Sequence, residues 1–157
     1  MQRAMAFVFL VCACGGGRGD DDDDDLPIPE ATLAGQVGAE GWELAGGYTN
    51  AFLSEGEAEF FAELYAEQLE PCGFETPTRP HLIASIPKEP GEYSLSLSLN
   101  ATFVIEGADG PENLVATDGR IVVDEVTESS VRGGMSVSYD DDNEVEGQFE
   151  VAVCADE

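Results

Sequence analysis

The sequence predicts an all-β fold, either an antiparallel two-sheet sandwich or a small barrel of roughly seven to nine strands. Three observations support this prediction. Apolar and polar residues alternate in several stretches of the second half of the chain. Glycine, proline, aspartate and asparagine separate these stretches at near-regular spacing. Each stretch offers one apolar face, as expected of a strand that covers a core on one side.

The region after residue 26 begins with two short expected strands, over residues 32–38 and residues 41–48. Trp42 is expected to anchor the second strand in the core, because its large ring buries much apolar surface. Glycines punctuate both segments and are expected at turns or bulges. They are Gly38, Gly41, Gly46 and Gly47.

Residues 54–70 are open to two interpretations. The segment Ser-Glu-Gly-Glu at 54–57 matches a capping box, and Pro71 would end a helix. Apolar residues between them fall at helical spacing, at Phe60, Phe61, Leu64 and Tyr65. The local pattern therefore favours a short helix within 55–70. The alternative is a strand over residues 57–65, whose core face would hold Phe60, Ala62 and Leu64.

The middle of the chain is expected to be a loop followed by a clear strand. Prolines bar a long helix from residues 71–90, where only residues 81–86 form a short apolar segment. These prolines are Pro77, Pro80, Pro87 and Pro90. From Tyr93 onward, leucine and serine alternate strictly, which predicts a half-buried strand. Its apolar face would hold Leu95, Leu97 and Leu99.

The last third of the chain predicts strands joined by polar turns. Two alternating segments, residues 131–139 and 147–153, flank a turn at residues 140–143, where Asp and Asn suit a tight reversal. Further strands are expected at residues 102–106 and within 114–126, the latter interrupted at an Asp-Gly pair.

The charge of the chain restricts its partners. Asp and Glu number 33 against 6 Lys and Arg, for a formal net charge of −27. Such a field repels nucleic acid and anionic lipid headgroups, so no nucleic-acid role is expected. A run of six aspartates at residues 20–25 is expected to be a solvated, self-repelling spacer.

The first 25 residues resemble the signal peptide, lipobox and linker of a bacterial lipoprotein. Arg3 precedes a short apolar run that ends in Ala13 and Cys14. This run is too short to span a membrane, and a small residue stands before the cysteine, as lipidation requires. The resemblance implies a signal peptide over residues 1–13, a lipidated Cys14 and a tether over 14–25. Residues 26–157 would then form a single β domain.

The remaining sequence resembles a group of uncharacterised bacterial lipoproteins with a C-terminal all-β domain. The motifs are structural ones: a Gly-Trp strand near the start, an apolar-acidic strand running into Pro-Cys, a proline-and-glycine loop before a long strand, and a closing hairpin. They lie at Trp42, Glu63 to Tyr65, Pro71-Cys72, Ile86-Pro87, Gly91 to Tyr93 and Tyr139 to Cys154. The resemblance implies a strand rather than a helix at 57–65, a Cys72–Cys154 bridge, and no known activity.

The cysteine count agrees with the lipoprotein resemblance. Cys12 would leave with the signal peptide and Cys14 would carry lipid, so Cys72 and Cys154 would remain in an oxidising compartment. A disulfide is the default for such a pair, and two free buried thiols are the alternative.

Calcium is the one metal for which the sequence offers candidate ligands. Asp140, Asp142 and Glu144 have the every-second-residue spacing of calcium loops, but the glycine and the final acid of the full pattern are missing. A polar hairpin turn is therefore favoured over a metal site, and no cofactor is expected. Catalysis is not expected either, because His81 is the only histidine and the chain contains no Gly-x-Ser-x-Gly motif.

These observations predict a lipid-anchored envelope lipoprotein of the bacterial outer membrane, facing the periplasm or the surface. Its expected role is non-catalytic binding or structure, with an envelope protein, a polysaccharide or a small ligand as partner. Two alternatives remain open from sequence: a barrel-type carrier of a small ligand and a small secreted hydrolase.

Overall fold

The computed structural model describes residues 27–73, 75 and 77–155. These residues are nearly all β, with 59% in strands, which confirms the predicted all-β class. Eleven strands form one sheet, more than the seven to nine expected. The strands are β1 (Ala34–Val37), β2 (Glu40–Glu43), β3 (Gly46–Thr49), β4 (Glu59–Tyr65), β5 (His81–Pro87), β6 (Gly91–Ser94), β7 (Ala101–Gly107), β8 (Gly110–Ala116), β9 (Asp118–Val126), β10 (Ser130–Asp140) and β11 (Asn143–Ala152).

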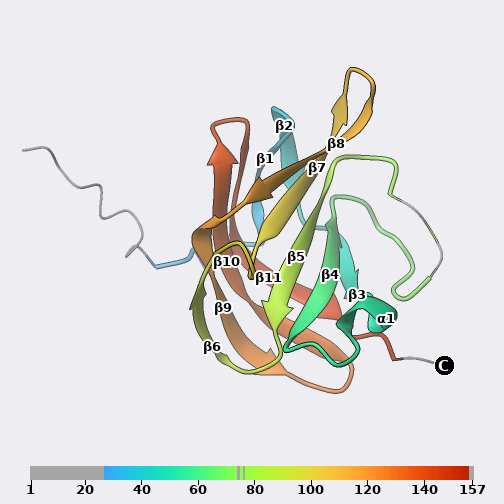
Figure 1. Cartoon of the computed structure of the whole chain (residues 1–157), viewed down its shortest axis with the longest axis vertical. Helices are drawn as coiled ribbons and strands as arrows, with labels where there is room; N and C mark the ends of the chain where they lie inside the picture. The colour runs from blue at the N-terminus through green and yellow to red at the C-terminus, as the bar shows by residue number, and fades with distance from the viewer. Residues whose placement is uncertain (1–26, 74, 76, 156–157) are drawn as a thin grey trace, which may run out of the picture.

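The sheet is curled on itself, so that its two halves face each other as layers (Figure 1). Its order is β6-β9-β10-β11-β3-β4-β5-β7-β8, with β1 and β2 extending from β11. The named strands pair antiparallel, as predicted, except at the junction of the layers. There β11 and β3 run parallel through one residue pair, Ala152 and Tyr48, which corrects the purely antiparallel expectation.

Inward-facing side chains of the two layers form one continuous core. Strand alternation explains which side chains enter the core, since every second residue of β4, β5, β9 and β10 points to the same side of the sheet. Trp42 is 5% exposed and belongs to this core, as predicted, and its indole Nε1 donates to the carbonyl of Pro80 at 3.1 Å. The largest core side chains include Leu33, Leu64, Leu82, Ile86, Phe103, Ile121, Met135 and Phe149.

The segment predicted from local pattern as a helix within 55–70 is mostly a strand. The only helix among the described residues is the single turn α1 (Ala51–Ser54), capped by the Asn50 side chain. Strand β4 follows it, with Phe60, Ala62 and Leu64 buried, as the strand alternative predicted. The helical interpretation was wrong because β4 pairs with β3 and β5 on its two sides, and this pairing outweighs local spacing.

Two other segments differ from the sequence prediction. Residues 81–87 were expected within a loop but form β5, which pairs with β4 and β7. The strand expected over residues 93–99 stops at Ser94, because the next residues turn. The amide of Ser96 donates to the carbonyl of Leu99, and its hydroxyl accepts from the amide of Leu99. Leu95 is therefore 8% exposed while Leu97 is 89% exposed.

The chain between Pro27 and Leu33 passes from the outer face of β10, where Ile28 lies, to the backbone edge of β11, where Leu33 enters the core. The backbone of Gln148 makes two hydrogen bonds to this segment. Its amide donates to the carbonyl of Ala31 at 2.7 Å, and its carbonyl accepts from the amide of Leu33 at 2.8 Å. Gly134 has no side chain where Ile28 approaches, and a Cβ there would lie 2.9 Å from the Ile28 side chain. The segment that leads toward the predicted tether is thus fixed to the sheet.

The predicted disulfide between Cys72 and Cys154 is present, with 5.6 Å between the Cα atoms. It joins the loop after β4 to the end of β11, beside the end of the molecule that carries α1 (Figure 1). At that end the ammonium of Lys88 donates to the carbonyls of Ser54 at 2.6 Å and Glu57 at 3.0 Å. The same ammonium lies 5.2 Å from the centre of the Phe60 ring.

Candidate functional site

A groove of about 500 Å³ lies at the end of the molecule opposite α1 and is called the mouth below. Three hairpins surround it: β1–β2, β7–β8 and β10–β11, which together form the upper end of the molecule in Figure 1. Its lining consists of Gly38, Ala39, Glu40, Pro80, Ile105, Glu106, Glu112, Leu114, Tyr139, Asp140, Asp142 and Asn143.

The mouth exists because two hairpins continue beyond the strands that flank them. Strand β7 pairs with β5 only as far as Val104, whereas its pairing with β8 continues to Gly107 and Gly110. Strand β10 likewise pairs with β9 only as far as Ser138, whereas its pairing with β11 continues to Asp140. Side chains that would enter the core further down the sheet therefore face an open space at this end.

Backbone and amide hydrogen bonds fix two of the three hairpin tips to each other. The buried Asn143 side chain accepts from the Gly38 amide at 2.8 Å and donates to the Asp140 carboxylate at 2.7 Å. The amide of Ala39 donates to the carbonyl of Asp142 at 3.0 Å. Gly38 and Ala39 have φ angles of 66° and 62°, which make the tight reversal that brings their amides to the other tip. One wall of the groove is thus preformed.

Tyr139 projects into the mouth from a β-bulge. The register of β10 against β11 shifts between Ser138 and Asp140, so Tyr139 is the extra residue of β10. Its side chain is 50% exposed. Together with Ile105, Leu114 and Pro80, it supplies the apolar part of the lining.

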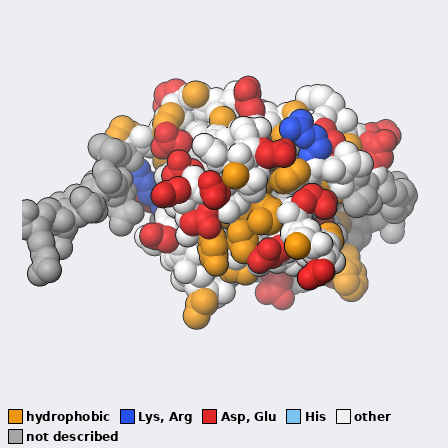
Figure 2. Space-filling view, turned by 90° about the horizontal axis from the view of Figure 1, so that it is seen from above, with side chains coloured by type: hydrophobic (Ala, Val, Ile, Leu, Met, Phe, Trp, Pro, Cys, Tyr) orange, Lys and Arg blue, Asp and Glu red, His pale blue; other side chains and the backbone are white. Residues whose placement is uncertain are grey.

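Carboxylates surround this apolar part. Figure 2 views the molecule from this end and shows acidic side chains gathered around an apolar area. Glu106 and Glu112 come from the β7–β8 hairpin, and the other acids come from the facing hairpins: Glu40, Asp140 and Asp142. Among the described residues that line the mouth, none is lysine, arginine or histidine. Arg79 precedes Pro80 in the chain but is not part of the lining.

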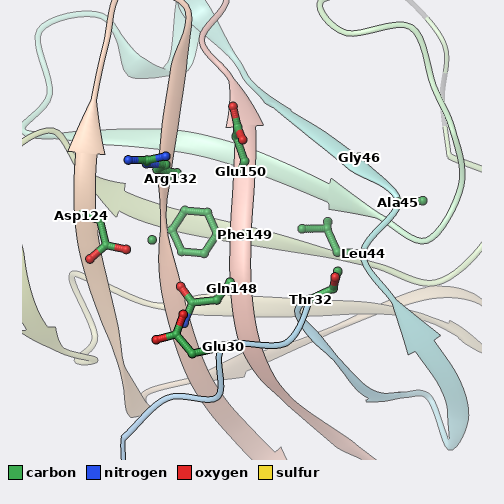
Figure 3. A pocket seen from close by; sticks show the side chains of 11 residues that line it. Glu30, Thr32, Leu44, Ala45, Gly46, Asp124, Arg132, Gln148, Phe149 and Glu150 are labelled. Carbon is green, nitrogen blue, oxygen red and sulfur yellow. The ribbon is translucent and has the colours of Figure 1, made fainter.

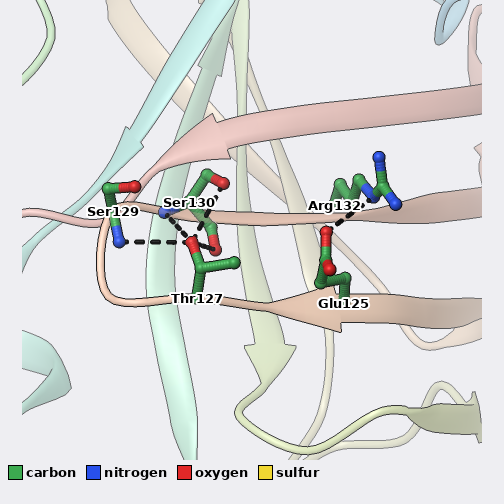
Figure 4. Close-up of polar contacts among 5 residues, drawn as sticks. All are labelled: Glu125, Thr127, Ser129, Ser130 and Arg132. Carbon is green, nitrogen blue, oxygen red and sulfur yellow. Dashed lines mark hydrogen bonds and ion pairs between the residues drawn. The ribbon is translucent and has the colours of Figure 1, made fainter.

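A second depression, of about 480 Å³, lies on the outer face of β10 and β11 (Figure 3). Three acids, Glu30, Asp124 and Glu150, line it together with one base, Arg132. Arg132 forms an ion pair with Glu125 at 3.2 Å, beside the hydrogen-bonded turn of Thr127 and Ser130 (Figure 4). Because Arg132 lies among these acids, this surface is less uniformly acidic than the mouth.

The candidate calcium ligands predicted from sequence do not share one site. Asp140 and Asp142 line the mouth, whereas Glu144 lines another depression together with Ser136 and Glu146. Alternation along β11 separates them, because Asn143 points inward and Glu144 points outward. In the described part of the chain, no group of three His, Cys, Asp or Glu side chains is arranged to hold a metal ion. The turn at residues 140–143 is a hairpin turn, with the Asp142 amide donating to the Asp140 side chain at 3.1 Å.

The only histidine, His81, follows Pro80 of the mouth lining but lies on the outer face of β5 and is not itself part of that lining. Its ring centre is 5.8 Å from that of Tyr65, which in turn donates its hydroxyl hydrogen to Glu63. Burial lowers the pKa of His81, against smaller raising effects of the Arg79 carbonyl and the carboxylates of Glu63 and Glu67. Burial also raises the pKa of Tyr65, so that this phenol keeps its proton. Both groups are occupied by contacts within the fold.

The two remaining sequence predictions about single residues have different outcomes. Cys72 and Cys154 are joined, as stated above, and Cys14 lies outside the described residues. Most of the mouth lining was not identified from the sequence, because its residues come from four separate segments. The one signal that pointed there was the acidic turn at residues 140–143.

Comparison with known proteins found no matching family model, no matching curated protein and no matching solved structure. In the described residues, no helix is long and apolar enough to cross a membrane. The mouth, with its preformed wall and uniform charge, is the surface on which a functional proposal rests.

Proposed function

We propose that this chain is a lipid-anchored lipoprotein of the bacterial outer membrane and that its β domain is a non-catalytic binding module. The mouth is its binding surface. The observation that carries the proposal is the cross-linking of the β1–β2 and β10–β11 tips through Asn143 and Ala39. A wall held in place before binding loses little conformational freedom when a ligand arrives, which favours affinity.

The exposure of Tyr139 supports a binding role for the mouth. A half-exposed aromatic ring with a polar tip is typical of recognition surfaces, because it offers contact area and a hydrogen bond together. Here the ring lines the groove from a β-bulge at the tip of β10. Bulges are common beside functional sites because they redirect one side chain.

The filled interior favours a binding module over a carrier. A carrier would hold its ligand between the layers, but side chains from both layers pack there in one core cluster. Phe103 and Met135, from opposite layers, are fully buried in that cluster. The mouth lies outside this cluster and is open to solvent, so a ligand reaches it without opening the sheet.

The anchor in this proposal is the lipid on Cys14, followed by the aspartate run. Between Cys14 and Pro27, an extended chain spans up to about 45 Å. The acidic domain would be repelled from anionic headgroups while the acyl chains hold it nearby. These two effects together would keep the mouth accessible to partners in the envelope.

Photo-crosslinking in the bacterium that makes the protein tests the binding surface. A photoreactive phenylalanine replaces Tyr139, which is 50% exposed. In a matched control strain it replaces Val115, which is 47% exposed. We expect a reproducible adduct from position 139 and none of the same mass from position 115. Equal adducts at both positions, or none at position 139, would contradict the proposal.

Fractionation tests the anchor separately. The native chain should sediment with the outer membrane and carry lipid on an N-terminal Cys14. The Cys14→Ser variant should move to the soluble fraction with its β domain intact by circular dichroism. Recovery of an unmodified native protein in the soluble fraction would remove the anchor from the proposal and leave the binding surface to be judged by crosslinking.

A further inference from the structure

We infer that the mouth takes an extended basic peptide segment in which lysine or arginine residues flank an apolar side chain. This inference rests on the proposed binding function of the mouth and names the class of its ligand. The partner would be a protein of the envelope that displays such a segment. The inference depends on the charge of the rims, on the apolar lining and on the rigidity of the walls.

The charge of the rims selects a cationic partner. Carboxylates stand on both sides of the groove, with Glu106 and Glu112 on one hairpin and Glu40 on a facing one. The carboxylates of Asp140 and Asp142 lie on the same side as Glu40. The described lining contains no lysine, arginine or histidine to offset these negative charges. A ligand with positive charges at both ends would be attracted to both rims, and the net charge of −27 would steer it from a distance.

The apolar lining selects a peptide with an apolar residue between its charges. Tyr139 is half exposed, and Ile105 and Leu114 are partly buried beside it. Covering these side chains with an aliphatic group removes apolar surface from water, which stabilises the complex. The aliphatic stems of lysine and arginine would add to this contact while their charged ends reach the rims.

Other occupants fit the groove less well. A second copy of the chain would bring its own acidic surface to the acidic rims, and like charges repel. A neutral polysaccharide could donate hydroxyl hydrogen bonds to the carboxylates, but it brings no positive charge to offset the acidic rims. A single metal ion would leave the apolar side chains uncovered. The basic peptide is the occupant that satisfies both the charged and the apolar parts of the lining.

Calorimetric titration of the purified full chain with defined peptides tests the inference. The probe is the blocked peptide Lys-Leu-Lys-Leu-Lys, compared with Lys-Gly-Lys-Gly-Lys and Glu-Leu-Glu-Leu-Glu. We expect binding of the first peptide, binding weaker by about tenfold for the glycine peptide, and no heat with the acidic peptide. Equal affinity for the leucine and glycine peptides, or no heat with either, would overturn the inference.

Paired charge variants separate the mouth from the overall field of the protein. Glu106→Gln with Glu112→Gln removes two charges from the mouth, and Glu128→Gln with Glu150→Gln removes two exposed charges elsewhere. We expect the first pair to weaken peptide binding about tenfold and the second pair less than about twofold. Equal weakening by both pairs would assign binding to the general charge and would overturn the inference.

A second pair of variants tests the apolar contact. Tyr139→Ala should weaken binding about fivefold, whereas Leu97→Ala, which removes an apolar side chain that is 89% exposed, should leave affinity unchanged. Unfolding curves of both variants check that the fold is kept. If crosslinks form at position 139 in cells while no basic peptide binds, the ligand class is wrong and the proposed binding function stands. If neither occurs, both fail.

Discussion

The two ends of the molecule are held together in different ways. At the end that carries α1, called the base here, a disulfide, a lysine ammonium and a hydrogen-bonded turn connect separate strands. The disulfide joins Cys72 to Cys154, and the carbonyl of Ser129 in the β9–β10 turn accepts from the amide of Val153. At the mouth, backbone amides and one buried Asn143 join the hairpin tips. Figure 1 shows the two ends at opposite poles of the long axis.

This difference separates stability from recognition. At the base, Lys88, Ser54 and Thr127 use their polar groups in internal contacts, so substitution of these residues should change the free energy of unfolding. The mouth is fixed through backbone groups and the Asn143 and Asp140 side chains, which leaves Tyr139 and four carboxylates directed to solvent: Glu40, Glu106, Glu112 and Asp142. Substitution of those side chains should change binding and leave stability nearly unaltered.

The largest expected effect at the base is loss of the disulfide. Reduction, or the double change Cys72→Ser with Cys154→Ser, should lower the free energy of unfolding by about 4–5 kcal/mol, because the bridge closes a long loop in the unfolded chain. Urea unfolding with and without reductant measures this, and the double variant should not respond to reductant. Equal stability of the reduced and oxidised native chain would show that the base does not depend on this bridge.

Removal of the Lys88 ammonium should have the next largest effect. Lys88→Met keeps an aliphatic stem but leaves the carbonyls of Ser54 and Glu57 without their donor, at an expected loss of about 1–2 kcal/mol. Arg79→Met serves as control, since Arg79 is exposed and its side chain is outside these contacts. Thermal unfolding of both variants gives the comparison. A loss for Arg79→Met as large as for Lys88→Met would contradict the assigned role.

Asn143→Ala tests whether the mouth needs its preformed wall. The amide of Gly38 would lose its acceptor, and we expect a loss of about 1 kcal/mol in stability. The same change should weaken binding of the leucine peptide, because the two hairpin tips would no longer be tied by this side chain. Urea unfolding and calorimetry on one protein sample give both quantities. Unchanged peptide affinity would show that preorganisation of the wall is unimportant.

The smallest expected effect is a pH dependence from His81, which lies on the outer face of β5 next to Pro80. Burial lowers its pKa in the folded state below the ordinary value of 6.5, so the unfolded chain takes up the proton first as the pH falls. The free energy of unfolding therefore has its full value, with respect to His81, above pH 6.5. It decreases as the pH falls from 6.5 toward the pKa of the folded state. His81→Leu should flatten this part of the profile of unfolding free energy against pH. Superimposable slopes for the native chain and His81→Leu would contradict the assignment.

The sequence predicted those elements that have a strong local pattern. Strands β10 and β11 and the turn between them lie where alternation and the Asp-Asn run placed them. The same rule misled at Leu97, because the serine side chain of Ser96 bonds to the backbone and turns the chain after Ser94. At β4 it was helical spacing that misled, because pairing with neighbouring strands decides the conformation there.

The candidate site could be predicted only in part. The acidic turn at residues 140–143 was recognised as a feature of the sequence, but its relation to Ile105, Leu114 and Pro80 depends on how far each hairpin extends past its neighbours. That extension is a property of register between distant segments. The bulge at Tyr139 is likewise not visible in the sequence, because the alternation of residues 131–139 continues through it.

The central claim is that recognition belongs to the mouth and not to the base. Titration of the ¹⁵N-labelled full chain with the Lys-Leu-Lys-Leu-Lys peptide, followed by amide chemical shifts, tests it most directly. We predict shifts for Gly38, Ala39, Ile105 and Tyr139, with the amides of α1 and of the Thr127 turn unmoved. Shifts confined to α1 and the Thr127 turn, or spread evenly over the surface, would contradict the account.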